Sequence, residues 1–152
     1  MFVINEELKE FLEKGLVSQL GTASAAGRPS AVNAWGPRVN ADASMTIFID
    51  TIRAARPLAN LAANPKVAVI FADPVSYRSI QVKGRWRSCS MPTAEDEAWV
   101  ARHRELVVAS LALVGDDPDT KTNVAWDELT RIDFEVEAAF DQTPGPLAGQ
   151  PL

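Results

Sequence analysis

Apolar and polar residues alternate in several short runs of this chain, and this period of two residues is typical of β-strands with one buried face. The clearest run covers residues 44–50, where one side of the predicted strand carries Met45, Ile47 and Ile49. Comparable apolar runs predict strands over residues 16–24, 30–38, 66–72, 79–87 and 132–137. The pattern therefore predicts six short strands.

Apolar residues spaced by three or four positions predict helices between these strands. One covers residues 6–14 and begins after Asn5, whose side chain suits a helix N-terminus. The longest runs from Thr93 to about residue 114, and Thr93 with Asp96 approximates a capping box. A short helix ends before Asn64-Pro65, and residues 124–130 predict a further helical turn.

The connections between strands decide the fold class. Turn sequences such as Gly27-Arg28-Pro29 join the first three strands, whereas a parallel sheet would need long crossovers. We therefore expect a mainly β fold with peripheral helices, arranged as a six-stranded antiparallel barrel. Residues 1–152 would form a single domain, with an irregular tail at residues 142–152 that is rich in proline and glycine.

Composition narrows the function classes. A length of 152 residues, 47% of them hydrophobic, fits one globular domain. The formal net charge of −5 argues against a nucleic-acid partner, because such proteins need a basic surface to neutralise phosphates. No apolar run approaches the ~20 residues that span a bilayer, and the first residues lack a secretory signal pattern. With one cysteine and hence no internal disulfide, the expected location is cytoplasmic, without a membrane partner.

Side chains for independent catalysis are scarce. His103 and Cys89 are the only histidine and cysteine, so the usual metal cluster of these residues is excluded and no metal is expected. A nucleophile and base pair formed by Cys89 and His103 is disfavoured, since His103 lies in a charged helical segment, residues 101–105. Any redox or transfer chemistry would therefore come from a bound cofactor.

The segment that follows the strand of residues 44–50 suits an anion. Asp50 and Thr51 end that strand, and Arg53, Arg56 and Pro57 lie at the opening of a short helix. Pro57 fits the first helical turn, where unpaired backbone N–H groups form a partial positive pole that favours a phosphate. Arg56 can add a planar, bidentate clamp. The alternative is a helix whose arginines are merely solvated.

The order and spacing of several motifs resemble the pyridoxamine 5′-phosphate oxidase-like, FMN-binding split-barrel family over about residues 5 to 90. These motifs are the N-terminal helix, Gly27-Arg28-Pro29, Thr51 with Arg56-Pro57-Leu58-Ala59-Asn60-Leu61, Asn64-Pro65-Lys66-Val67, and Val82-Lys83-Gly84. The resemblance implies a six-stranded split β-barrel that forms a homodimer and binds two FMN molecules in clefts between the subunits.

The resemblance also implies roles for residues around the anion segment. Arg56 matches the family arginine that grips the FMN phosphate. Pro57 stands where the family often has a second basic residue, so Arg53 is expected to compensate. Thr51 matches a position that contacts the flavin or its ribityl chain, and we include the adjacent Asp50 in the predicted site.

Other predicted contacts lie on two strands. Asn33, Ala34 and Trp35 match the strand that runs beside the isoalloxazine ring. Ser79 and Gln81 match a strand that approaches the flavin from the partner subunit. Trp35 could equally be a core aromatic, and Gln81 could be an exposed strand residue without a ligand.

The C-terminal tail departs from the true oxidases, which end in a segment with arginine and histidine that binds the substrate phosphate. Here no basic residue follows Arg131, so the vitamin B6 reaction is doubtful. Such a tail in isolation would usually be disordered. Its low charge and its leucines lead us instead to expect that residues 142–152 pack over the flavin cleft or the partner, with Thr143 as a hydrogen-bond donor to the cofactor.

The resulting hypothesis is an FMN-dependent oxidoreductase acting on an unidentified small-molecule substrate or electron acceptor. Two alternatives remain open from the sequence. One is a reductase that uses a deazaflavin in the same cleft. The other is a non-catalytic protein that stores, senses or carries a flavin or haem.

Overall fold

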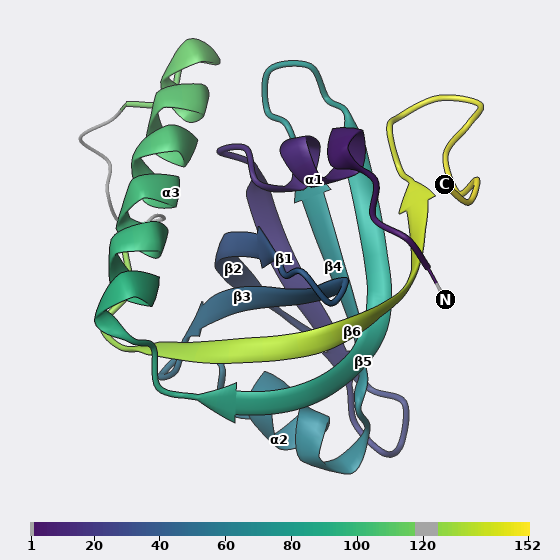
Figure 1. Ribbon diagram of the computed structural model, residues 1–152, viewed down its shortest axis with the longest axis vertical. Helices are drawn as coiled ribbons and strands as arrows, with labels where there is room; N and C mark the ends of the chain where they lie inside the picture. The colour runs from purple at the N-terminus through teal and green to yellow at the C-terminus, as the bar shows by residue number, and fades with distance from the viewer. Residues whose placement is uncertain (1, 118–124) are drawn as a thin grey trace.

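Six strands close an antiparallel barrel in the order β1-β2-β3-β6-β5-β4 in the computed structural model, which describes residues 2–117 and 125–152 (Figure 1). The elements are α1 (Glu6–Leu12), β1 (Val17–Ala23), β2 (Pro29–Val39), β3 (Ser44–Asp50), α2 (Ala55–Ala63), β4 (Lys66–Ala72), β5 (Ser79–Ser90), α3 (Ala94–Leu113) and β6 (Leu129–Asp141). The predicted mainly β barrel with peripheral helices is confirmed.

Strands β5 and β6 are longer than their sequence patterns predict. They pair with each other from Ile80 opposite Asp141 to Ser90 opposite Arg131, with two bulges along the way. At the first bulge, a Cβ on Gly84 would lie 1.9 Å from the Glu135 carbonyl oxygen. Only glycine allows the two backbones to approach this closely.

The helical turn expected over residues 124–130 is wrong for the described residues 125–130. No helix forms there, and Leu129 begins β6 opposite Asp50. The backbone N–H of Thr51 donates to the Glu128 carbonyl at 2.8 Å. These pairings with the end of β3 compete successfully with a local helical turn. Residue 124 lies outside the described part of the chain.

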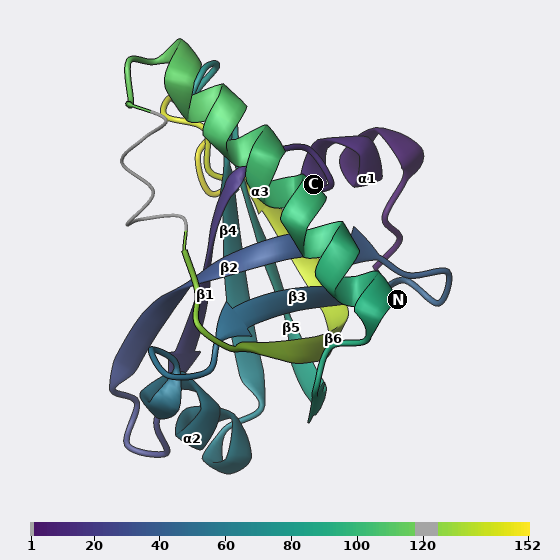
Figure 2. The ribbon, with the colours of Figure 1, turned by 90° about the vertical axis from the view of Figure 1, so that its left-hand side faces the viewer.

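Strand β3 is buried on both faces because it lies between two apolar cores. Met45, Ile47 and Ile49 point into the barrel interior, as their alternation predicts. Phe48 points outward and is covered by α3, together with Trp35 of β2. Figure 2 shows α3 lying along the outside of the barrel, across β2 and β3.

The contact between α3 and β2 depends on Gly36. Its φ is +52°, and a Cβ at this position would lie 2.8 Å from Cγ2 of Val100. The Gly36 N–H donates to Nδ1 of His103 at 3.1 Å, and its carbonyl accepts from Nε1 of Trp99 at 3.0 Å. Close packing and two hydrogen bonds therefore fix the long helix on the sheet.

The shorter helices close the two ends of the barrel (Figure 1). Helix α1, capped by Asn5 as predicted, buries Leu8, Phe11 and Leu12. Helix α2 buries Leu61 at the opposite end, and its Asn60 amide donates to Oγ1 of Thr22 and to Oγ of Ser30, at 3.1 and 2.9 Å. None of the described helices is long and apolar enough to cross a membrane.

Candidate functional site

The N-terminus of α2 carries an unpaired positive pole. Ala54 occupies the cap position and supplies no side-chain hydrogen bond. Within the described chain, the backbone N–H groups of Ala55 and Arg56 have no acceptor, and the exposed Arg56 guanidinium has no partner. Pro57 is buried in the first turn. The arrangement fits an anionic group, because two free N–H donors, the helix dipole and a cation meet at one place.

Asp50 shapes the turn that leads into this pole. The residue is 3% exposed, and Oδ1 accepts the backbone N–H groups of Ile52 and Arg53 at 3.0 and 3.4 Å. Oδ2 accepts the N–H of Asp127 at 3.3 Å. The Asp50 carboxylate therefore accepts two backbone N–H groups of the turn before α2, so these donors are not available to a ligand. Asp50 supports the site from beneath and does not face a ligand.

Arg53 contacts the segment that precedes β6, and Thr51 contacts the beginning of β6. Nε of Arg53 lies 3.7 Å from Oδ2 of Asp50, and Nη1 donates to the Ala125 carbonyl at 3.4 Å. The Thr51 hydroxyl lies 2.8 Å from the Thr130 hydroxyl. Arg53 is half-exposed and can turn toward a ligand only by giving up these contacts, so Arg56 is the freer cation.

The three predicted residues of β2 point in alternate directions. Asn33 is exposed on the outer face of the barrel, and its side chain accepts from Gln19 at 3.3 Å. Ala34 is buried in the barrel core. Trp35 is 6% exposed beneath α3, with its ring centroid 5.3 Å from that of Trp126. Of the three, only Asn33 has an exposed side chain on the outer face, and Trp35 occupies the core position given above as its alternative.

Ser79, Gln81 and Thr143 form a second group, on the far side of the same face. Ser79 and Gln81 are half-buried at the beginning of β5. Thr143, in the tail, accepts the Ser79 backbone N–H with its hydroxyl at 3.1 Å. The sequence predicted Ser79 and Gln81 from one argument and Thr143 from another, and the structure brings Thr143 into contact with Ser79.

One row of paired residues connects the two groups across the sheet. Asn33 of β2 pairs with Gln19, Gln19 with Ile70, and Ile70 with Gln81 of β5. Asn33 and Gln81 are three interstrand spacings apart, a distance of roughly 14 Å along the sheet. Within one chain, the predicted contacts therefore lie at the two ends of a row rather than around one cavity.

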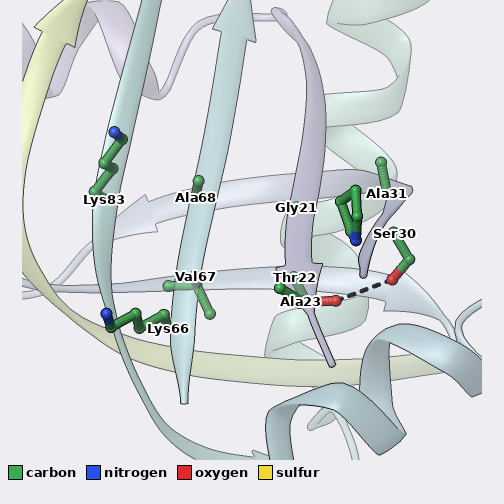
Figure 3. A pocket seen from close by; sticks show the side chains of 10 residues that line it. Gly21, Thr22, Ala23, Ser30, Ala31, Lys66, Val67, Ala68 and Lys83 are labelled. Carbon is green, nitrogen blue, oxygen red and sulfur yellow. Dashed lines mark hydrogen bonds between the residues drawn. The ribbon is translucent and has the colours of Figure 1, made fainter. Parts of the chain in front are cut away.

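Small side chains line the same outer face beside this row, two residues further along the strands. A hollow of about 620 Å³ lies on it, extending over β2, β1, β4 and β5 (Figure 3). Gly21, Ala31 and Ala68 line the middle of this hollow, and Lys66 and Lys83 lie on the side formed by β4 and β5. Lys83 Nζ stands 4.8 Å from the Phe140 ring centroid. Small residues on adjacent strands leave room for another layer to approach this face.

The histidine and cysteine do not form a catalytic pair. His103 is 4% exposed, its Nδ1 accepts from Gly36, and burial lowers the pKa of its imidazole to about 4. Cys89 is exposed on β5, and desolvation raises the pKa of its thiol. Among residues 2–117 and 125–152, no group of three or more histidine, cysteine or acidic side chains could hold a metal ion.

A buried ionic cluster beside α3 was not predicted. Asp96 is 1% exposed and pairs with both Arg38, at 2.8 Å, and Arg131, at 3.1 Å. The predicted capping box between Thr93 and Asp96 is present. The arginines come from two different strands, so only the three-dimensional pairing reveals that the cluster fastens α3 to the barrel.

Comparisons with known proteins agree with this architecture. A family model described as pyridoxamine 5′-phosphate oxidase matches residues 4–134. No sequence among the curated proteins matches the chain.

Three solved structures illustrate the shared fold. An FMN-binding protein from Syntrophomonas wolfei has a TM-score of 0.55 and 13% identity, covering 89% of this chain and 86% of its own. An F420 reductase has a TM-score of 0.56 and 18% identity, with 90% and 98% covered. The haem storage protein HutZ from Vibrio cholerae has a TM-score of 0.51 and 21% identity, with 92% and 95% covered. At these identities the likeness concerns the fold.

Proposed function

Because the chain belongs to the pyridoxamine 5′-phosphate oxidase family, we propose that it binds FMN, with the flavin phosphate on the pole at the start of α2. The observation that carries this proposal is the unpaired pole itself. Arg56 and the N–H groups of Ala55 and Arg56 converge there without an internal partner among the described residues. A phosphate monoester would supply the missing acceptors with charge-assisted hydrogen bonds.

Asn33 and Thr51 extend the proposed site from this pole. Asn33 lies on β2 beside the end of β3, and Ala34, the next residue, pairs with Ile49. Thr51 is held by Thr130 and by the Glu128 carbonyl. In the proposal, the ribityl chain and ring pass over this rigid corner, while the second group of Ser79 and Gln81 is too far away in the same chain to contact the same ring.

A homodimer would complete the site. In a two-fold interface each copy meets the other with the same surface. If the outer sheet faces meet across the row from Asn33 to Gln81, the symmetry sets Gln81 of the partner subunit beside Asn33. Gln19 and Ile70 would then lie at the axis, and Gly21, Ala31 and Ala68 would let the two sheets approach. Two equivalent cofactor sites would result.

The proposed reaction is a redox reaction of a small molecule. A bound flavin supplies hydride or electron transfer, and the protein supplies orientation and electrostatics. This chain holds the phosphate at Arg56, aligns the cofactor along β2, and excludes water with the second subunit.

The geometry favours flavin over histidine-ligated haem. His103, the only histidine of the sequence, is a residue of α3 that is buried against β2, and its Nδ1 accepts from Gly36. Its other ring nitrogen, Nε2, has no partner among the described residues but is buried, so an iron could reach it only if the surrounding side chains moved. A deazaflavin carrying a phosphate could use the same pole, so the nature of the ring must be determined by experiment.

The absorption spectrum of the freshly purified protein tests the proposed function. Bands of an oxidised flavin, retained on a desalting column, are the expected result. A Soret band would support the haem alternative, and a shorter-wavelength band would point to a deazaflavin. A colourless protein whose spectrum does not change on addition of FMN would refute the proposal.

A further inference from the structure

The C-terminal tail, residues 142–152, is folded back onto the end of β6. The N–H of Asp141 donates to the Gln150 carbonyl at 2.9 Å, and the N–H of Leu152 donates to the Ala139 carbonyl at 3.0 Å. The N–H of Gly149 donates to the Asp141 carbonyl at 2.6 Å. Backbone hydrogen bonds therefore hold the tail in one place despite its prolines and glycines.

From this position the tail binds both main-chain groups of Ser79. Oγ1 of Thr143 accepts the Ser79 N–H at 3.1 Å, and the N–H of Gln142 donates to the Ser79 carbonyl at 2.8 Å. The Thr143 hydroxyl itself points to the same carbonyl, at 3.5 Å. The N–H of Thr143 donates to Oδ1 of Asp141 at 2.7 Å, which fixes the threonine in turn.

Ser79 is the first residue of β5, and the hairpin before it is held in an unusual conformation. Tyr77 has a φ of +61°, which is uncommon for a bulky residue, and its side chain is 69% exposed. The Ser79 hydroxyl donates to the Tyr77 carbonyl at 3.1 Å. Asp73 also holds the hairpin, through backbone hydrogen bonds with Tyr77 and Arg78. Ser79 therefore links this hairpin to the tail through its contacts with Tyr77 and Thr143.

We propose that Thr143 is a positioning residue that holds Ser79 and the start of β5 in the orientation used to complete the partner's cofactor site. The inference rests on the proposed function for the identity of that site. It replaces the expectation that Thr143 donates directly to the cofactor, because its hydroxyl is already engaged with Ser79 on both sides. The tail acts through β5 and leaves the phosphate pole at α2 untouched.

Two substitutions separate the effect of the Thr143 hydroxyl from the effect of the side chain's shape. Thr143→Val keeps the volume and removes the acceptor of the Ser79 N–H, whereas Thr143→Ser keeps the acceptor. Ser88→Ala is the matched control, since it removes an exposed β5 hydroxyl with only a 3.4 Å contact to Asp133. Hydrogen exchange of the backbone amides of residues 79–81 and flavin affinity are measured for all three variants and the wild type.

In Thr143→Val, exchange at residues 79–81 is expected to accelerate, and affinity for FMN and riboflavin is expected to fall equally, by about tenfold, the loss for one hydrogen bond. Thr143→Ser should restore both, and Ser88→Ala should change neither. Unchanged exchange in Thr143→Val, or a loss confined to FMN, would overturn the inference. If the wild type binds no flavin the proposed function fails, and the exchange data still decide whether Thr143 holds the start of β5.

Discussion

Asp50 holds Arg53: Nε of the arginine lies 3.7 Å from Oδ2 of the buried carboxylate, and the Arg53 backbone N–H also donates to Oδ1. Arg56, three residues further on, has no such partner in the described part of the chain. The two arginines that open α2 are therefore not equivalent. Arg53 belongs to the framework of the turn, and Arg56 is available to an incoming anion.

Replacement of Arg56 tests this distinction. We expect Arg56→Ala to weaken FMN binding by about 1.5–3 kcal/mol, the range for hydrogen bonds to charged groups. Riboflavin, which lacks the phosphate, should bind the variant and the wild type about equally. Arg53→Ala is the companion variant and should cost FMN affinity less. Equilibrium titration that gives the same FMN dissociation constant for Arg56→Ala and wild type would reject the assignment.

Gly84 tests the β5–β6 bulge. A Cβ at this position would lie 1.9 Å from the Glu135 carbonyl oxygen, so the two backbones must separate in Gly84→Ala. We expect a loss of about 3 kcal/mol in the free energy of unfolding, measured in urea. Ser88→Ala on the same strand is the control, because it removes an exposed hydroxyl with only a 3.4 Å contact to Asp133. That variant should change stability by less than about 1 kcal/mol. Equal effects would contradict the bulge geometry.

The buried His103 predicts a pH dependence of stability. Burial lowers the pKa of its imidazole to about 4 from 6.5, so the unfolded chain binds the proton more readily than the folded chain. Stability should therefore decrease as the pH falls through the window from about 6.5 to about 4, by up to about 3 kcal/mol. Urea denaturation across this window should show the slope in the wild type and a flatter curve in His103→Gln. Equal curves would mean that His103 titrates normally.

The proposed interface predicts a dimer that a single charge can split. Ile70 lies at the centre of the row from Asn33 to Gln81, so Ile70→Glu would bring two carboxylates together at the two-fold axis. Sedimentation should show a dimer for the wild type and a monomer with weakened FMN binding for Ile70→Glu. Leu113→Glu, at a position 77% exposed at the end of α3, is the control and should remain dimeric. A monomeric wild type that retains FMN would contradict the interface.

The strands of the barrel follow from local sequence pattern, but the lengths of β5 and β6 do not. The residues that extend β5 beyond its predicted end, Ser88 to Ser90, are small or polar and show no apolar alternation. In the structure they pair with residues 131–133 of β6, from Ser88 opposite Asp133 to Ser90 opposite Arg131. Such pairings join residues far apart in the sequence, so the alternation of a single strand cannot reveal them.

In the candidate site, too, some contacts follow from local sequence and others do not. The pole at α2 is local, since Arg56, Pro57 and the free N–H groups lie within one helical turn. Its inner partners are not local: Asp127, just before β6, donates to Asp50, and Thr130, in β6, contacts Thr51. The contact between Ser79 and Thr143 joins residues 64 positions apart, and nothing in the sequence of either segment predicts it.

Titration of the ligand-free protein with FMN and with riboflavin, followed by the change in flavin fluorescence, tests the central claim most directly. The phosphate pole predicts saturation at one FMN per chain and clearly tighter binding of FMN than of riboflavin, because only FMN reaches Arg56 and the free N–H groups of α2. Equal affinities for the two flavins, or no binding of either, would contradict the account.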